Sequence, residues 1–268
     1  MMEYTWNVAK GDDLIPLRNH EPTVLEFLKK VSGRNKVLVD VGAHIGWYSV
    51  VLSKYYGKII AIEPNPNNYQ LLLKNLKDNK IENVTTINVA VGERRGKVFI
   101  TNEGAHSTVY KHNVGNCIEV EVKPLDDLIE HADVIKIDVE GYELNVIDGA
   151  IKLIRRCKPI LVIEHHGYWV DDYDIDHEII LDILRPYYYA LNINQYHWAY
   201  IPREMDLGEF GEYVANHWFY SVVVKNLRSG LEWYHGLPYE WWHGKSILEW
   251  YNELKRRIKY EDEWFKIF

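Results

Sequence analysis

This chain contains little cysteine and no long apolar run. The two cysteines, Cys117 and Cys157, are far apart, so neither a disulfide framework nor a cysteine metal site is implied. No run approaches the ~20 apolar residues that a membrane-spanning helix needs. Residues 1–10 also lack the apolar segment of a signal peptide. We therefore expect a cytoplasmic protein without a membrane span.

An excess of basic residues is also absent. The 31 basic and 39 acidic residues give a net charge of −8, which argues against a broad nucleic-acid footprint. There is no internal repeat and no low-complexity linker. Hydrophobic residues make up 47% of the 268 residues, enough for the core of one large domain and too many for a disordered chain.

A glycine-interrupted stretch organises the first part of the chain. The apolar run Val37–Val41, broken only by Asp40, stops at Gly42, and a second glycine, Gly46, opens an amphipathic run at 47–55. This pattern predicts a buried strand, a tight turn and a helix start. Glycine tolerates a positive φ there and has no Cβ to hold a ligand away from the backbone.

An acidic residue follows the next apolar run. Residues 59–62 end at Glu63, roughly 20 residues after the first strand, where a carboxylate can accept both hydroxyls of a ribose. The glycine spacing is G-x-x-x-G rather than G-x-G-x-x-G, so a nucleoside without a pyrophosphate fits better. S-adenosylmethionine (SAM) is the common one. The alternative is a turn in any doubly wound domain, with Glu63 merely solvated.

The remaining periodicity alternates between strands and helices, which predicts an α/β fold with a doubly wound, mostly parallel sheet. An antiparallel insertion, with strands at 97–101 and 117–122, is expected after the third strand. The expected helices are 22–31, 45–55, one that starts within 64–68 and ends near Asn79, a short one opening at Pro124, 142–156 and 179–184. The expected strands of the main sheet are 37–41, 59–63, 84–91, 134–138, 159–164, 187–193 and 218–224, the last antiparallel between the fifth and sixth.

Polar side chains stand at the carboxyl ends of four of these strands. Ligands of open parallel sheets bind at that edge, so these groups are expected to converge on one crevice. They are Asp40, Glu63, Asp138 with Glu140, and Glu164 with His165.

Five sequence blocks carry a resemblance to a known family. They are Asp40-Val41-Gly42-Ala43-His44-Ile45-Gly46, Glu63-Pro64-Asn65-Pro66, Asn88-Val89-Ala90-Val91-Gly92, residues 135–143 with Gly149-Ala150, and residues 159–164. The most specific is 135–143, Ile-Lys-Ile-Asp-Val-Glu-Gly-Tyr-Glu. Over residues 21–167 the chain resembles the FkbM-type SAM-dependent methyltransferases, which have the class I, Rossmann-like methyltransferase fold. One departure is His44, where the family more often carries Asn; a side-chain donor is kept.

The resemblance implies O-methylation, often of sugars or hydroxylated natural products. It implies that Gly42 and Gly46 cradle the methionine part of SAM and that Glu63 holds the ribose. The Ala90-Val91 segment would lie against the adenine, and Asp138 would sit near the sulfonium and the acceptor. Asp40 and His44 complete the cofactor-binding set.

A sugar hydroxyl has a high pKa, so a base or a metal must take its proton during methyl transfer. The candidates are Asp138, Glu140, Glu164 and His165. Asp138 and Glu164 are preferred, with His165 or His166 as proton acceptor. Glu140 and Glu143 equally suit capping of the next helix, and the two histidines equally suit backbone bonding. No spacing fixes a metal ligand set, so we expect catalysis without a metal, a divalent cation being the alternative.

The last hundred residues are less informative. Residues 194–216, with Tyr196, His197, Trp198 and Tyr200, read either as an insertion that forms part of an acceptor pocket or as a structural loop. We expect a methyltransferase domain at 1–225 and an aromatic, helical extension at 226–268. The extension packs on the domain or on a second copy of the chain.

Two other functions are open. Lys136, Asp138 and Glu164 loosely match the set of an RNA ribose 2′-O-methyltransferase, although the acidic charge counts against RNA. The other is a SAM- or carbohydrate-binding protein without catalysis. The expected partner is a small-molecule or glycan acceptor.

Overall fold

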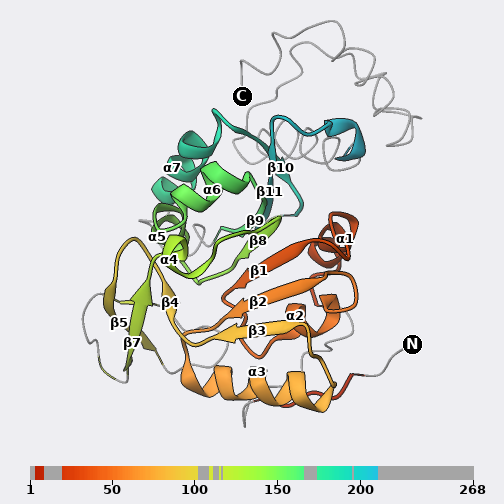
Figure 1. Cartoon of the computed structure of the whole chain (residues 1–268). Coiled ribbons are helices and arrows are strands. Elements are labelled where there is room, and N and C mark those ends of the chain that lie inside the picture. The colour runs from red at the N-terminus through yellow and green to blue at the C-terminus, as the bar shows by residue number, and fades with distance from the viewer. Residues whose placement is uncertain are drawn as a thin grey trace, which may run out of the picture.

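The computed structural model describes residues 4–8, 20–101, 109–110, 115, 117–165, 174–194 and 196–210. Its centre is a seven-stranded sheet in the order β10-β11-β9-β8-β1-β2-β3 (Figure 1). β1, β2, β3, β8 and β9 are parallel, and β11 is antiparallel to both of its neighbours. This is the doubly wound, class I methyltransferase-like sheet that the sequence predicted.

The strands of this sheet are β1 (Val37–Val41), β2 (Lys58–Ile62), β3 (Val84–Ile87), β8 (Val134–Ile137), β9 (Ile160–Glu164), β10 (Tyr188–Asn192) and β11 (His197–Pro202). One face is covered by α1 (Pro22–Lys30), α2 (Trp47–Leu52) and α3 (Pro66–Asp78). The other is covered by α4 (Leu125–Leu128), α5 (Glu143–Asp148), α6 (Ile151–Cys157) and α7 (Asp174–Leu184). A 3₁₀ turn, η2 (Leu207–Phe210), follows β11. Within the described residues, no helix has both the length and the apolarity to cross a membrane.

A second, four-stranded sheet lies beside the first in the order β4-β7-β5-β6. Its strands are β4 (Ala90–Val91), β5 (Gly96–Thr101), β6 (Val109–Tyr110) and β7 (Cys117–Lys123). The antiparallel insertion is therefore confirmed. The single strand predicted at 84–91 is wrong in one respect: it divides at Asn88, whose side-chain amide donates to the carbonyl oxygen of Glu63 at 2.7 Å.

The helix predicted at 142–156 is also divided, into α5 and α6. The break falls at Gly149, which packs closely against the backbone of Gly92, the residue that follows β4. A Cβ at Gly149 would lie 2.1 Å from the carbonyl oxygen of Gly92. The backbone of the helix can approach that carbonyl only because the residue is glycine.

The predicted seventh strand, 218–224, lies outside the described residues, as does the extension at 226–268. The place between the fifth and sixth strands is taken instead by β11, so the prediction of its position was wrong. Residues 197–202 are likewise a strand within the sheet and not part of an insertion over it. A short hairpin explains this, because Ile193 donates its N–H to the carbonyl oxygen of His197 and returns the chain at once.

Candidate active site

Residues that are paired on neighbouring strands form rows across the sheet, and the polar residues lie in particular rows. On the face covered by α1 and α2, the first row is apolar and includes Leu38, Val134 and Ile160. The second row holds Asp40 and Lys136 among Ala61, Val162 and Ala199. The third row, at the carboxyl edge of the parallel strands, consists of Glu63, Gly42, Asp138, Glu164 and His197. The alternation of side chains thus brings most of the predicted site residues onto one face.

The glycine turn is fixed between two strands. The N–H groups of Gly42 and Ala43 both donate to the carbonyl oxygen of Ile62, at 2.9 and 3.0 Å. Gly42 has φ +83°, and a Cβ on it would lie 1.7 Å from the carbonyl oxygen of Asp138. Gly46 has φ +85° at the start of α2. Both glycines are therefore required by backbone conformation, and Gly42 by a close approach as well.

Glu63 is held rigidly behind this turn. One carboxylate oxygen accepts the N–H of His44 and the other accepts the N–H of Asn65, each at 2.8 Å. The side chain of Asn68 provides a further hydrogen bond. Burial raises the pKa of Glu63 to about 7, although these donors oppose the shift. A carboxylate has about four acceptor positions, so one remains for a hydroxyl donor such as a ribose.

A buried ion pair occupies the middle of the site. Lys136 Nζ lies 2.9 Å from Asp138 Oδ2 and 4.6 Å from the centre of the Tyr48 ring. Burial alone would lower the pKa of Lys136, but the carboxylates of Asp138 and Asp40 outweigh it, so the lysine stays charged. Asp40 accepts a hydrogen bond from Ser49 at 2.8 Å, and burial raises its pKa. This charged layer lies directly beneath the carboxyl edge.

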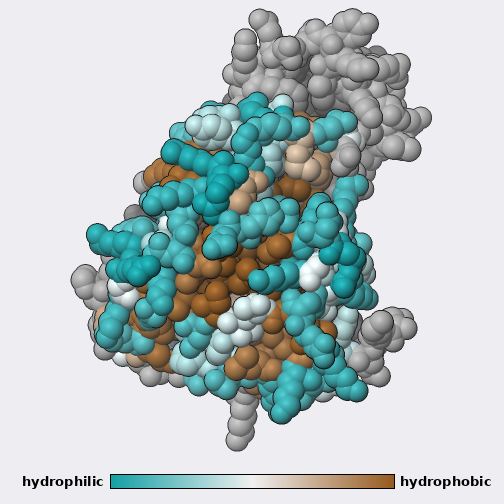
Figure 2. Space-filling model, in the orientation of Figure 1, coloured by the Kyte–Doolittle hydropathy of each residue, from teal (hydrophilic) through white to brown (hydrophobic). Residues whose placement is uncertain are grey.

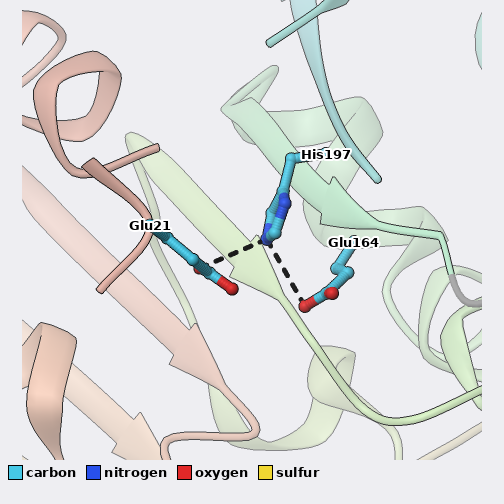
Figure 3. A group of neighbouring side chains, drawn as sticks. All are labelled: Glu21, Glu164 and His197. Carbon is cyan, nitrogen blue, oxygen red and sulfur yellow. Dashed lines mark ion pairs between the residues drawn. The ribbon is translucent and has the colours of Figure 1, made fainter. Parts of the chain in front are cut away.

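Glu21, Glu164 and His197 meet at one end of the third row (Figure 3). His197 Nε2 lies 3.4 Å from a carboxylate oxygen of each glutamate. The hydroxyl of Tyr48 donates to the same oxygen of Glu21. Burial lowers the pKa of His197, but Glu164 and Glu21 outweigh it and raise that pKa to about 9. Burial alone would raise the pKa of Glu21, but His197 and Lys136 hold it at about 2.

Three predicted residues lie elsewhere. His165 is on the opposite face from Asp138 and Glu164, where its Nε2 lies 3.0 Å from the Tyr200 hydroxyl. Its predicted partnership with Asp138 and Glu164 is therefore wrong, because neighbouring residues of a strand point to opposite faces. Ala90 and Val91 are buried in hydrophobic clusters, so their side chains offer no open surface to an adenine.

The loop after β8 contains a tight turn. Glu140 has φ +53° in a turn with Gly141, whose φ is +94°. Glu143 accepts the N–H of Gly141 at 3.0 Å, which supports its role at the start of α5 rather than in catalysis. His166 lies outside the described residues.

Two members of the site, Glu21 and His197, were not among the predicted catalytic or cofactor-binding residues. Glu21 entered the sequence analysis only as the first residue of the stretch that resembles the family, directly before the predicted helix 22–31, and His197 only as part of the aromatic segment 194–216. Nothing in residues 197–202, His-Trp-Ala-Tyr-Ile-Pro, marks His197 by itself as part of a site.

The fold is the doubly wound sheet of a class I methyltransferase-like domain, with polar side chains gathered at the carboxyl edge of its parallel strands. Residues 40–191 match the family model described as the methyltransferase FkbM domain, which is more than half of the chain. The chain belongs to this family.

Two known methyltransferases are similar to this chain in sequence. The chain is 27% identical over 161 residues to the hexuronic acid methyltransferase AglP of Haloferax volcanii, covering 58% of this chain and 66% of that protein. It is 26% identical over 156 residues to the methyltransferase sdnD of Sordaria araneosa, covering 43% and 60%. It thus spans less than two thirds of these relatives. A solved FkbM methyltransferase from Methylobacillus flagellatus KT is similar with a TM-score of 0.47 and 23% identity, over 63% of this chain and 44% of that one.

Proposed function

We propose that this chain binds SAM at the carboxyl edge of its sheet and transfers a methyl group to a hydroxyl of a sugar-like acceptor. The observation that carries the proposal is the third row, in which a glycine turn, a buried acid after β2 and two further carboxylates share one face. The family membership supports methyl transfer. The name of AglP, a hexuronic acid methyltransferase, supports a sugar as acceptor.

The residues present fit SAM. Gly42 and Gly46 leave the backbone of the turn without side chains, as a bound methionine moiety requires. Glu63 is fixed in orientation and keeps acceptor capacity for a ribose hydroxyl. When bound, SAM supplies a methyl group that is already activated for in-line displacement. The protein's task is then to align the acceptor and remove its proton.

Asp138 and Glu164 are the proposed acceptor-side carboxylates. Their side chains are 23% and 17% exposed, so an acceptor can reach them, whereas Lys136 beneath them is 2% exposed. Asp138 is held by Lys136, which fixes its position. Glu164 lies 3.4 Å from His197 Nε2, and this ion pair holds the carboxylate in place.

Figure 2 shows one face of the molecule, which is mostly hydrophilic and has a patch of apolar side chains in the middle of the view. Lys136 is covered by the Tyr48 ring and is paired with Asp138. Its burial counts against the ribose 2′-O-methyltransferase alternative, which relied on Lys136 as part of the acceptor site.

The test has two stages. Calorimetry with SAM and with S-adenosylhomocysteine measures cofactor binding, and transfer of a labelled methyl group is then measured with hexuronic-acid oligosaccharides, neutral sugars and RNA. We expect micromolar binding and transfer to a sugar hydroxyl. Failure to bind either nucleoside, or transfer to RNA alone, would overturn the proposal.

A further inference from the structure

We propose that Glu21, Glu164 and His197 form a binding site for a divalent cation of the Mn²⁺ or Zn²⁺ type. The sequence analysis favoured catalysis without a metal because no local spacing supplies a ligand set. The structure assembles these ligand atoms from three distant segments: the residue before α1, the end of β9 and the start of β11. Figure 3 shows the three side chains pointing toward one another.

The distances suit coordination. Each residue offers one ligand atom, and all three atoms lie within 4.8 Å of one another. His197 Nε2 is 3.4 Å from an oxygen of Glu21 and 3.4 Å from an oxygen of Glu164. Two ligands held ~2.0–2.2 Å from one ion at a tetrahedral angle are about 3.3–3.6 Å apart.

The atom at the centre of this group is a buried nitrogen. The side chain of His197 is 2% exposed, and its Nε2 has no hydrogen-bond partner among the described residues. The two carboxylates are near enough for ion pairing but are not aligned as hydrogen-bond acceptors. A buried polar atom aimed between two acidic groups without a hydrogen bond is a feature that a bound cation explains.

The other ring nitrogen shows which tautomer the neutral ring adopts once a cation displaces the proton from Nε2. The side-chain oxygen of Asn194 accepts the backbone N–H groups of Tyr196 and His197, both at 2.9 Å, so that atom is an acceptor. His197 Nδ1 lies 3.1 Å from the same oxygen and must therefore carry a proton to bond it. In the neutral ring the lone pair is then on Nε2, facing the glutamates. A histidine oriented through its second nitrogen is the usual arrangement at a metal site.

The donor set defines the kind of ion. One imidazole nitrogen with two carboxylate oxygens suits Mn²⁺ and Zn²⁺ better than Mg²⁺ or Ca²⁺, which prefer oxygen alone. Two negative carboxylates balance the two positive charges of the ion. Tyr48, which donates to Glu21, orients one of the ligands from behind.

Three protein ligands leave coordination positions open, as in catalytic metal sites. An acceptor hydroxyl placed there would have its pKa lowered by the ion, beside Glu164 in the third row. This catalytic role rests on the proposed function, whereas the binding of the ion does not. The two can therefore fail separately.

The test measures the ion itself on the full chain. Mn²⁺ binding is followed by electron paramagnetic resonance and Zn²⁺ binding by calorimetry, without SAM or acceptor. We expect one site per chain with a micromolar or tighter Kd, and at least a tenfold weaker Kd in Glu164→Gln and in Glu21→Gln. Asn194→Ala should weaken binding by about 10- to 100-fold while leaving all three ligands in place.

Glu130→Gln and His131→Gln are matched controls, because both residues are exposed and lie outside the group. They should bind as the parent chain does. Circular dichroism of each variant checks that the fold is kept. No binding at millimolar Mn²⁺ or Zn²⁺, or equal binding in the Glu164→Gln and control chains, would overturn the proposal. Binding with no methyl transfer under any condition would leave the ion site standing and remove the catalytic role.

Discussion

Glu164 and His197 stand directly opposite each other in the antiparallel pair of β9 and β11. Because β11 runs against its neighbours, its first residue lies at the edge where the parallel strands end. A histidine far along the chain is thus delivered beside the carboxylate at the end of the fifth strand, with Nε2 at 3.4 Å from Oε2. The hairpin between β10 and β11 is therefore part of the site as well as of the sheet.

Glu63 should determine cofactor affinity. We expect Glu63→Ala to weaken SAM binding by at least tenfold, because the ribose loses a carboxylate held by two backbone N–H groups. Calorimetry measures the Kd, and Glu82→Ala, an exposed residue before β3, is the control. An unchanged Kd in Glu63→Ala would remove this assignment.

Stability should depend on pH through the same residue. The pKa of Glu63 is about 7 in the folded chain against an ordinary value of 4.5, so the folded state keeps a proton that the unfolded chain releases. The stabilisation it gives is complete below about pH 4.5 and is lost as pH rises to about 7, by up to about 3 kcal/mol. Urea unfolding of the parent and of Glu63→Gln at pH 5 and pH 7.5 measures the difference. Parallel pH profiles would contradict the shift.

Asp138→Asn should abolish turnover and spare the fold. We expect a fall in kcat of at least 100-fold, because the amide can neither accept the hydroxyl proton nor pair as a charge with Lys136. SAM affinity should change by less than the turnover. Asp182→Asn, whose side chain is 74% exposed, is the control. Full activity of Asp138→Asn would place the chemistry elsewhere.

Gly42→Ala should destabilise the chain by about 2–5 kcal/mol. Its φ of +83° strains any residue with a Cβ, and that atom would lie 1.7 Å from the carbonyl oxygen of Asp138. The control is Gly96→Ala, where the nearest atom to the new Cβ is 3.8 Å away. Thermal unfolding of both variants tests the prediction, and equal midpoints would refute it.

Much of the fold could be predicted because strand and helix periods are local. β1 was predicted with its observed bounds, β2 and β9 within about one residue, and the end of α3 likewise within about one residue. The divisions at Asn88 and Gly149 could not be predicted, because they depend on the contact of Asn88 with Glu63 and on that of Gly149 with Gly92. β11 was missed because its partner β9 is far away in sequence, and pairing rather than composition makes it a strand.

The sequence predicted the site residues that stand at the ends of strands. It did not predict on which face of the sheet each side chain lies. Glu63, Asp138 and Glu164 lie on one face because each is separated by an even number of positions from the buried row that it extends. His165 is one position further and points away. Glu21 and His197 come from a helix start and an antiparallel strand, and no local pattern connects either of them with the crevice.

A crystal structure with S-adenosylhomocysteine bound tests the central claim most directly. The account predicts the nucleoside across the turn at Gly42 and Gly46, with a ribose hydroxyl within hydrogen-bond distance of Glu63 and the sulfur facing Asp138. A crevice that stays empty at saturating nucleoside, or a nucleoside bound on another face of the sheet, would contradict it.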